Sequence, residues 1–309
     1  MPSCAGKGSE FRVPDRTPGA QLGGDMEFAN PFEAEGNWYR GNLHIHTTES
    51  DGIHTPDQAA RLYRDRGYDF ICISDHHRVT SVKNKPEDLL IIPGAEMGRG
   101  PVHVVGVDVS AGFDAQGMKL QEVIDRINGQ RGMAIIAHPY WSAITSAELA
   151  GAEGYAGFEI FNNVCNNIKG KGYSTVHFDE VLQSGKRILG FASDDTHCEK
   201  DLFGGCIMVK ARSLEKECIM DSLRKGLFYS STGMSISGLE VKEGKITISC
   251  QASESVNFVG YGFMGNLVCA EAGATLTRAE YQVKGTEKYL RIEITGKSGL
   301  KAWTNPMFL

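Results

Sequence analysis

The chain has 309 residues and a formal net charge of −6. Apolar residues make up 41% and charged residues 23%, which is typical of a globular chain with one large domain or two smaller ones. No block of Lys and Arg is long enough to predict a groove for nucleic acid. No run reaches the ~18 apolar residues of a membrane span, and the N-terminal stretch lacks the apolar core of a signal peptide. Eight cysteines without a Cys-x-x-Cys pair favour a reducing, cytoplasmic location.

Residues 1–35 predict a loosely ordered arm, and a first strand is expected from Trp38 onward. This strand carries His44 and His46, which point to the same face because side chains alternate along a strand. Two imidazoles on one face can hold one metal ion. An isolated His-x-His pair is more often accidental, so the metal hypothesis depends on matching ligands elsewhere in the chain.

Strands and helices then alternate as far as about residue 227. Thr55 to Gln58 predict a helix start with a capping box. Near-continuous apolar strands are expected at 69–74, 89–92, 103–107, 133–137, 157–161 and 187–192. Such strands between helices are typical of a parallel sheet or barrel. Polar residues follow the strands, and in barrels of this type the chemistry lies at the carboxyl ends of the strands.

Histidines gather at these strand ends. Seven of the nine lie at or beside one, namely His44, His46, His76, His77, His103, His138 and His197. Asp51, Glu96 and Asp195 add carboxylates in the same layer. Imidazole with carboxylate suits Zn, Mn or Fe, and a bridging carboxylate such as Glu96 lets two cations lie close together. The set is large enough for two or three divalent metal ions.

Several positions keep a second interpretation. His77 is either a proton donor that binds no metal or a packing neighbour of His76. His103 is either a metal ligand or an ordinary strand residue. Asp194 and Asp195 compete for one place, and we favour Asp195 because it shares a strand face with His197. Asp75 is expected to orient a ligand imidazole rather than to bind metal.

From about residue 235 the pattern changes to short alternating strands with Gly-rich breaks. This pattern predicts a small antiparallel β unit, resembling a sandwich. It contains no His, so we assign it to packing, substrate shaping or assembly. The expected organisation is an arm over 1–35, an α/β domain with the candidate metal ligands over 36–234 and a C-terminal β domain over 235–309.

At these residues the sequence resembles the PHP (polymerase and histidinol phosphatase) superfamily. The resemblance covers about residues 40–233 and rests on His44-x-His46 with Ser50–Asp51–Gly52, Ser74–Asp75–His76, Pro93–Gly94–Ala95–Glu96, Ala137–His138–Pro139 and Ser193 to His197. The last of these carries an additional Asp, which leaves the register between Asp194 and Asp195 open. The ending Ala302–Trp303–Thr304–Asn305–Pro306 resembles that of the CehA/McbA-type branch, with Thr304 where Ser is usual.

This resemblance implies a distorted (β/α)7 PHP barrel with a di- or trinuclear metal centre. Carried over residue by residue, one metal takes His44, His46, Glu96 and Asp195. A second takes Asp51, His76 and His197. A third shares Glu96 and adds His103 and His138.

The resulting hypothesis is a metal-dependent phosphoesterase that cleaves a small phosphorylated metabolite with a metal-bound hydroxide. His77 is the candidate general acid, and Arg78, Arg99 and Asn162 are candidates for holding substrate oxygens. The alternatives are a carboxylic or carbamate ester hydrolase with the same metal centre, or a non-catalytic metal-binding module. No membrane partner is expected, and the oligomeric state stays open.

Overall fold

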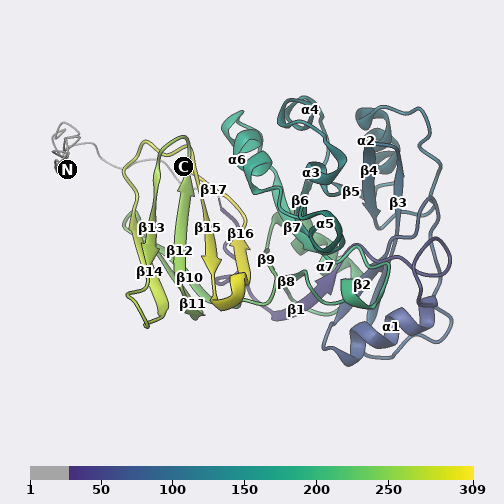
Figure 1. The fold of residues 1–309 in the computed structure, drawn as a ribbon, viewed down its shortest axis with the longest axis horizontal. Coiled ribbons are helices and arrows are strands. Elements are labelled where there is room, and N and C mark those ends of the chain that lie inside the picture. The colour runs from purple at the N-terminus through teal and green to yellow at the C-terminus, as the bar shows by residue number, and fades with distance from the viewer. Residues whose placement is uncertain (1–27) are drawn as a thin grey trace, which may run out of the picture.

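The computed structural model describes residues 28–309, without the side chain of Arg99 (Figure 1). Fourteen strands form one mixed sheet that runs through the molecule, and three more form a smaller sheet. Seven neighbouring strands at one end of the larger sheet surround the predicted ligands. These strands are β1 (Asn37–Asn42), β2 (Phe70–Ile73), β3 (Leu90–Arg99), β4 (Val102–Val107), β5 (Met133–Ile136), β6 (Gly157–Asn162) and β7 (Leu189–Ser193).

The pairing of these strands is mixed rather than all parallel. β1 and β2, β2 and β3, β5 and β6, and β6 and β7 pair in parallel. β4 is antiparallel to both β3 and β5, because β3 and β4 form a tight hairpin. The paired strands form an open sheet, because β1 and β7 do not pair as strands. One isolated parallel bridge, between Ile45 and Thr196, links the segments that follow β1 and β7. The structure is therefore a mixed α/β fold with a large central sheet, and the expected (β/α)7 barrel is not confirmed.

Helices cover the sheet around this region, and each of the longer ones buries one apolar face. They are α1 (Pro56–Asp65), α2 (Leu120–Gly129), α3 (Pro139–Ser142), α4 (Ser146–Gly151), α5 (Asn163–Lys169), α6 (Thr175–Gln183) and α7 (Lys216–Lys225), with two short 3-10 turns at Glu199–Asp201 and Lys297–Gly299. The capping box predicted for the first helix is present, since Thr55 accepts from the Gln58 amide and Gln58 closes back on Thr55. None of the described helices has the length and apolar character needed to cross a bilayer.

The C-terminal strands form two packed layers at the left of Figure 1. β8 (Cys206–Ala211), β9 (Phe228–Ser231) and β16 (Lys301–Thr304) continue the large sheet into β15 (Tyr289–Thr295), β12 (Ser255–Gly260) and β13 (Gly265–Cys269), with β17 (Met307–Phe308) beside β15. The smaller sheet contains β10 (Ile236–Lys242), β11 (Lys245–Ser253) and β14 (Leu276–Gln282). An apolar core that includes Ile248, Val256 and Ile292 lies among strands of both layers. The two layers resemble the expected antiparallel sandwich, but one layer is continuous with the central sheet.

Two features connect the C-terminal strands to the rest of the fold. Trp303 is buried and stacks on Phe161 at 6.2 Å between ring centroids, so it belongs to the core around β6. Asn305 donates to the carbonyls of Gly226 and Phe228 and accepts from the Gly190 amide. The boundary at residues 234 and 235 stays a prediction.

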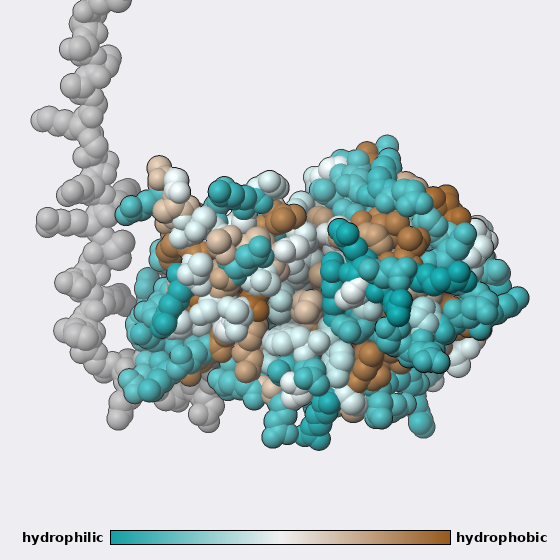
Figure 2. Space-filling view, turned by 90° about the horizontal axis from the view of Figure 1, so that it is seen from below, coloured by the Kyte–Doolittle hydropathy of each residue, from teal (hydrophilic) through white to brown (hydrophobic). Residues whose placement is uncertain are grey.

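The described part of the predicted N-terminal arm packs against the C-terminal layers. Phe28 and Phe32 lie on the apolar core of the β layers, and Asn30 donates to the carbonyl of Leu239. Residues 28–35 are therefore not loose, and residues 1–27 lie outside the described part of the chain. The face in Figure 2 alternates hydrophilic areas with separate apolar patches and shows no continuous apolar band.

Candidate metal centre

The predicted ligands come from separate strands and meet in one buried layer. His44 and His46 lie just beyond β1, His76 beyond β2, His138 beyond β5, and Asp195 and His197 beyond β7. Glu96 lies within β3 and His103 within β4. The remaining predicted ligand, Asp51, lies in the turn after His46 and is about half exposed. The structure brings all nine side chains together.

A first group contains three donor atoms that lie close enough together to hold one metal ion, from His44, His46 and Glu96, with Asp195 beside them. His44 Nε2 and His46 Nε2 lie 3.1 Å apart. Glu96 Oε2 lies 3.4 and 3.3 Å from these two nitrogens, and Asp195 Oδ1 lies 3.2 and 3.1 Å from them. Ligands about 2.0–2.1 Å from one zinc ion stand about 3.3 Å from one another in a tetrahedron, and the donor atoms of His44, His46 and Glu96 have this spacing. The residues present therefore fit a divalent metal ion.

A second group is open to solvent through Asp51. Asp51 Oδ2 lies 3.4 Å from His76 Nε2 and 3.4 Å from His197 Nε2. The other oxygen of Asp51 lies 3.5 Å from His46 Nδ1. Partial burial alone would raise the pKa of Asp51, but the His197 and His76 imidazoles outweigh it and hold the pKa far below its usual value. The side chains of this group could hold a second ion.

Glu96 connects the first group to a third. Its Oε1 lies 2.8 Å from His103 Nδ1 and 3.4 Å from His138 Nε2. Its Oε2 faces His44 and His46, and lies 3.1 Å from His76 Nδ1. A buried carboxylate whose two oxygens face different imidazoles is arranged as a bridge between cations.

The charges of this layer are strongly coupled. Burial lowers the pKa of His44, but the carboxylates of Asp195, Glu159 and Glu96 outweigh this effect and raise it well above the usual value. Burial likewise raises the pKa of Glu96, while His44, His103 and His138 bring it well below its usual range. Buried carboxylates that lie close together are stable only when a positive charge pairs with them, which here is either an imidazolium or a metal cation.

The choice between Asp194 and Asp195 is made by the backbone. β7 ends at Ser193, so strand alternation does not govern the two residues, and that reason for preferring Asp195 was wrong. Asp195 instead adopts a left-handed φ of 54° and turns its carboxylate toward His44 and His46. Asp194 faces the opposite way and accepts from Tyr63 Oη and the amides of Phe203 and Gly205.

Glu159 is a buried residue of the candidate site that the sequence did not point to. It lies in the middle of β6, is 2% exposed and accepts from His44 Nδ1 at 2.8 Å. Its other oxygen accepts from the backbone amide of His138 at 2.9 Å. A carboxylate on the far nitrogen of a ligand imidazole fixes the ring and its tautomer. The sequence feature that could have identified Glu159 is its position as an acidic residue within the apolar run Gly157–Phe161.

Two residues have roles different from those expected. Asn162 is fully buried, and its amide donates to Glu159 Oε2 and Asp195 Oδ2 while its carbonyl accepts from the Cys165 amide. It is a positioning residue and not a substrate contact. The carboxylate of Asp75 accepts hydrogen bonds from Thr47, Ser50 and Thr80 and not from a ligand imidazole. It holds the turn that carries Asp51.

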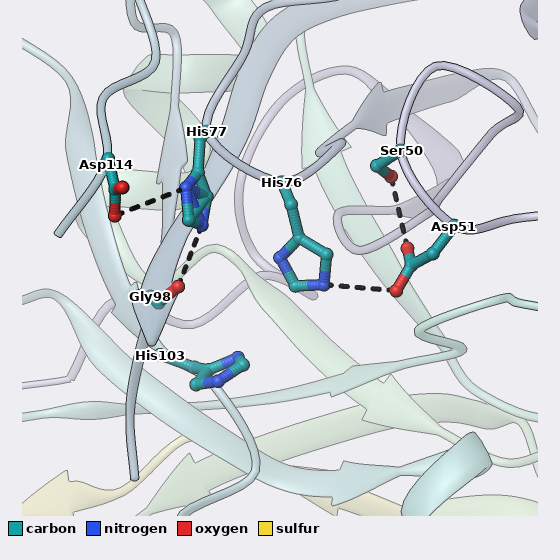
Figure 3. Close-up of a pocket in the computed structure, with 7 residues that line it drawn as sticks. All are labelled: Ser50, Asp51, His76, His77, Gly98, His103 and Asp114. Atoms are coloured by element: carbon teal, nitrogen blue, oxygen red, sulfur yellow. Dashed lines mark hydrogen bonds and ion pairs between the residues drawn. The ribbon is translucent and has the colours of Figure 1, made fainter. Parts of the chain in front are cut away.

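The other candidates lie at the rim. His77 contacts the Gly98 carbonyl through Nε2 at 2.8 Å, and its Nδ1 lies 3.7 Å from Asp114 (Figure 3). Arg78 is about half exposed and pairs with Glu49 at 2.8 Å, so it is directed to another protein side chain. The side chain of Arg99 lies outside the described residues.

Two cavities border the ligand layer. The outer cavity, of about 640 Å³, is lined by Ser50, Asp51, His76, His77, Gly98, His103 and Asp114, as Figure 3 shows. The inner cavity, of about 310 Å³, has predicted ligands on one side. Its remaining lining residues are Trp141, Val164, Cys165 and Ile168. Both cavities reach His76 and His103, so a substrate in either can contact the centre.

Comparison with known proteins supports the fold. No family model matches this chain. An alignment 117 residues long with an uncharacterized protein of Methanocaldococcus jannaschii shows 24% identity and covers 33% of this chain and 68% of that protein. A two-domain protein from Bacteroides vulgatus containing a predicted PHP-like metal-dependent phosphoesterase matches 92% of this chain and 98% of its own, with a TM-score of 0.53 and 14% identity.

A further solved structure is an amidohydrolase from Chromobacterium violaceum with bound sulfate. It covers 61% of this chain and 96% of its own at 14% identity, with a TM-score of 0.37. The likeness to the Bacteroides vulgatus protein extends over nearly the whole of both chains, including the C-terminal β strands. The protein described here therefore shares the overall fold of the Bacteroides vulgatus protein, and its described residues include a cluster of His, Asp and Glu that could hold metal.

Proposed function

We propose that this protein is a metal-dependent hydrolase, and more specifically a phosphoesterase that acts on a small phosphorylated molecule. The observation that carries the proposal is the position of Glu96, whose two buried oxygens face separate imidazole groups. A structural metal site needs one closed set of ligands. Shared carboxylates with an adjoining cavity are instead typical of multi-metal hydrolases. We assign two or three divalent ions of Zn, Mn or Fe to these residues.

The likeness to PHP-like proteins supports the same assignment. We further propose the distorted (β/α)7 arrangement and the CehA/McbA-type branch, the latter on the ending Ala302 to Pro306. In that ending Thr304 Oγ1 accepts from the amide of Ile292, a bond that a Ser hydroxyl could also make. The departure from the usual Ser is therefore compatible with the same local structure.

Metal ions bound here would lower the pKa of a water and neutralise charge on the reacting ester. The protein's own residues hold the ligands in place for this chemistry. Glu159 fixes the ring of His44, and Asn162 fixes the carboxylates of Glu159 and Asp195. The turn carrying Asp51 is fixed by Asp75 through Ser50 and Thr47. Because these groups are locked before substrate arrives, little reorganisation is needed during the reaction.

His77 remains our candidate for proton donation, with a restriction. It lines the outer cavity and not the inner one. It can therefore serve a leaving group in the outer cavity alone. Arg78 and Arg99 stay candidates for substrate contacts at the rim, and Arg78 would first have to leave Glu49.

One observation favours a second candidate, a carboxylic or carbamate ester hydrolase. Among the described residues that line the two cavities there is no Lys or Arg. A phosphoryl group would then depend on the metal ions for its positive partners, whereas a neutral ester needs fewer of them.

The test is a hydrolysis panel on protein reconstituted with Zn, Mn or Fe. Phenyl phosphate, phenyl acetate and phenyl N-methylcarbamate share phenol as the leaving group. Their relative rates therefore show whether the enzyme prefers a phosphoryl, acyl or carbamoyl group. We expect phosphate release to exceed the other two reactions. Hydrolysis of the acetate or carbamate alone would instead support the second candidate.

His44→Ala should abolish turnover and bind fewer metal ions, while Glu217→Gln on the exposed surface should change neither. Wild-type rates in His44→Ala would refute the metal assignment. Full metal binding without any turnover would leave only a metal-binding module.

A further inference from the structure

The second ligand group borders both cavities. Asp51 and His76 line the outer cavity, where Figure 3 shows them, and they also line the inner one together with His197. His44 and His46 of the first group line neither cavity. A substrate in either cavity therefore meets the second group, so the placement of its side chains bears directly on how a substrate is held for reaction.

Asp201 is a completely buried carboxylate in the same loop as His197, the loop 194–205 between β7 and β8. Its Oδ2 accepts from the backbone amide of His197 at 3.3 Å and from the amide of Cys198 at 3.0 Å. The Cys198 thiol donates to the same oxygen at 3.1 Å. Hydrogen bonds to an ionised acceptor are roughly twice as strong as neutral ones, so Asp201 fixes the backbone on which the His197 ring is mounted.

The other oxygen of Asp201 is not explained by the stability of the fold. Asp201 Oδ1 is buried and has no hydrogen-bond partner among the described residues. Burying a carboxylate oxygen without a donor costs stability. Groups that lower stability in this way are found mainly at functional sites, which indicates that Asp201 serves the ligand beside it.

The ring of His197 is tied to this same stretch of backbone. His197 Nδ1 donates to the carbonyl of Asp195 at 2.8 Å, and its Nε2 lies 3.4 Å from Asp51 Oδ2. A hydrogen bond from one ring nitrogen to a carbonyl fixes the tautomer and leaves the other nitrogen to bind metal. The carbonyl of His197 in turn accepts from the amide of Ile53, in the turn that carries Asp51, at 3.2 Å. A shift of the His197 backbone would therefore move Nε2 relative to Asp51.

The helix α5 holds the loop that carries Asp201. Asn163 donates through Nδ2 to the backbone carbonyl of Asp201 at 2.9 Å, and Asn167 donates to the carbonyl of Lys200 at 3.1 Å. Asn163 also packs against Gly204, where an added Cβ atom would overlap the Asn163 side chain. Because the loop is bonded to a regular helix at these points, Asp201 is itself held in a defined position.

From these contacts we infer that Asp201 is a positioning residue for metal binding at the second group, and that it acts through the backbone of His197. The inference rests on the proposed function, because it takes the second group to hold a divalent ion. Asp201 is not among the residues that line either cavity. Loss of its carboxylate should weaken the binding of one ion by about 10–100-fold, as for other partners of metal ligands, and leave the remaining ions bound.

The experiment is a double-mutant cycle in the full chain, measured by metal binding without substrate. Competition with a chromogenic chelator gives the number of bound Zn²⁺ ions and their affinities for the wild type, Asp201→Ala, His197→Ala and the variant with both changes. His197→Ala should lose one ion, and Asp201→Ala should weaken the binding of one ion only. Because Asp201 acts through His197, adding Asp201→Ala to His197→Ala should weaken binding no further.

Two further variants separate positioning from a general loss of stability. Asp201→Asn keeps an oxygen that can accept from both amides, so it should bind this ion more tightly than Asp201→Ala does. It also allows the same cycle if Asp201→Ala does not fold. Glu199→Gln is the matched control, because Glu199 is an acidic residue of the same 3-10 turn with a side chain that is 72% exposed. This control should bind every ion like the wild type.

The possible failures are distinguishable. If the Asp201 variants keep the wild-type affinity for every ion, weaken all ions equally, or weaken binding by the same factor with and without His197, the positioning role is overturned and the metal centre stands. If His197→Ala keeps every ion, the assignment of His197 as a ligand is overturned, and the role of Asp201 with it. A wild-type chain that binds no divalent ion would overturn the proposed function itself.

Discussion

At the scale of single residues, the candidate centre depends on groups one step removed from the donor atoms. Glu159 and Asn162 contact the predicted ligands His44 and Asp195 and are both almost completely buried. Partners of this kind fix the orientation of ligands and raise their affinity for metal. Their identity cannot be deduced from spacing, because Glu159 meets His44 across 115 positions of sequence.

Glu159→Gln is expected to weaken metal binding by about 10–100-fold, since the amide no longer holds His44 by a charged hydrogen bond. Affinity measured by competition with a chromogenic chelator checks this. Glu217→Gln, an exposed carboxylate on α7, serves as control and should bind like the wild type. An unchanged affinity in Glu159→Gln would mean that the ring of His44 is held by its other neighbours.

The neighbouring aspartates provide a matched pair. Asp195→Asn should weaken metal binding by more than the ~10–100-fold of an outer partner, because its carboxylate faces His44 and His46 directly. Asp194→Asn should keep the full metal stoichiometry and lower stability by about 1–3 kcal/mol, because an NH2 group replaces one of the two oxygens that accept from buried donors.

Metal content by elemental analysis and melting temperature by calorimetry separate the two effects. If Asp194→Asn loses the metal and Asp195→Asn keeps it, the register adopted here is the wrong one.

At the scale of elements, β15 and β16 contain a charged cluster that links the C-terminal part of the large sheet to α6. Glu293 and Trp303 are opposite each other in the antiparallel pair, and Trp303 Nε1 donates to Glu293 Oε2 at 3.0 Å. Lys301 also contacts Glu293, and Arg291 on the same strand forms a bidentate pair with Asp179 of α6 at 2.6 and 2.7 Å. The cluster connects the end of the chain to the helix layer over β6.

The Glu293 cluster predicts a dependence of stability on pH. Burial raises the pKa of Glu293, but Lys301, Arg291 and Trp303 bring it below the ordinary value of 4.5. A lowered folded pKa means that the carboxylate stabilises the fold above that value, and that this contribution is lost as pH falls through the folded pKa. Glu293→Gln should therefore melt at a lower temperature than the wild type at pH 7.

Melting curves from pH 7 down to pH 3 check this expectation. The gap between wild type and Glu293→Gln should narrow below about pH 4.5, where the unfolded carboxyl begins to bind protons. A gap that stays constant over the whole range would show that lost packing, and not charge, destabilises the variant. Glu280→Gln, on the exposed face of β14, is a control whose curve should follow the wild type closely.

At the scale of the whole molecule, the C-terminal strands form one structure with the ligand-bearing region. β16 extends the central sheet by pairing with β9, and Trp303 and Tyr289 belong to the core that contains Phe158 and Phe161. Burial of side chains this large contributes about 1.5–3 kcal/mol each. The ligand layer is therefore supported by residues near the end of the chain.

A chain that ends after Gly233 is expected not to fold stably, because it exposes the edge of β9 and the core face that Trp303 covers. Circular dichroism, sedimentation and thermal melting of this truncated chain, beside the full chain, check the expectation. Cooperative melting near the temperature of the full chain would show that the two regions are independent domains.

Much of this organisation could be predicted from local patterns, and the failures have a common cause. Strand and helix alternation, the capping box at Thr55 and the change of pattern near residue 235 each depend on neighbours within a few positions. The antiparallel β3–β4 hairpin, the open strand order and the packing of residues 28–35 depend on contacts between distant segments. Such contacts leave little trace in the periodicity of one segment.

The sequence by itself determined the chemical character of the site, because His, Asp and Glu side chains carry donor atoms that can bind metal wherever the chain places them. Only the tertiary structure decided how these atoms meet. The left-handed turn at Asp195 chooses between two adjacent carboxylates, and long-range contacts recruit Glu159 and convert Asn162 into a positioning residue. Donor chemistry belongs to a residue, whereas distance and orientation arise from the packing of strands far apart in the chain.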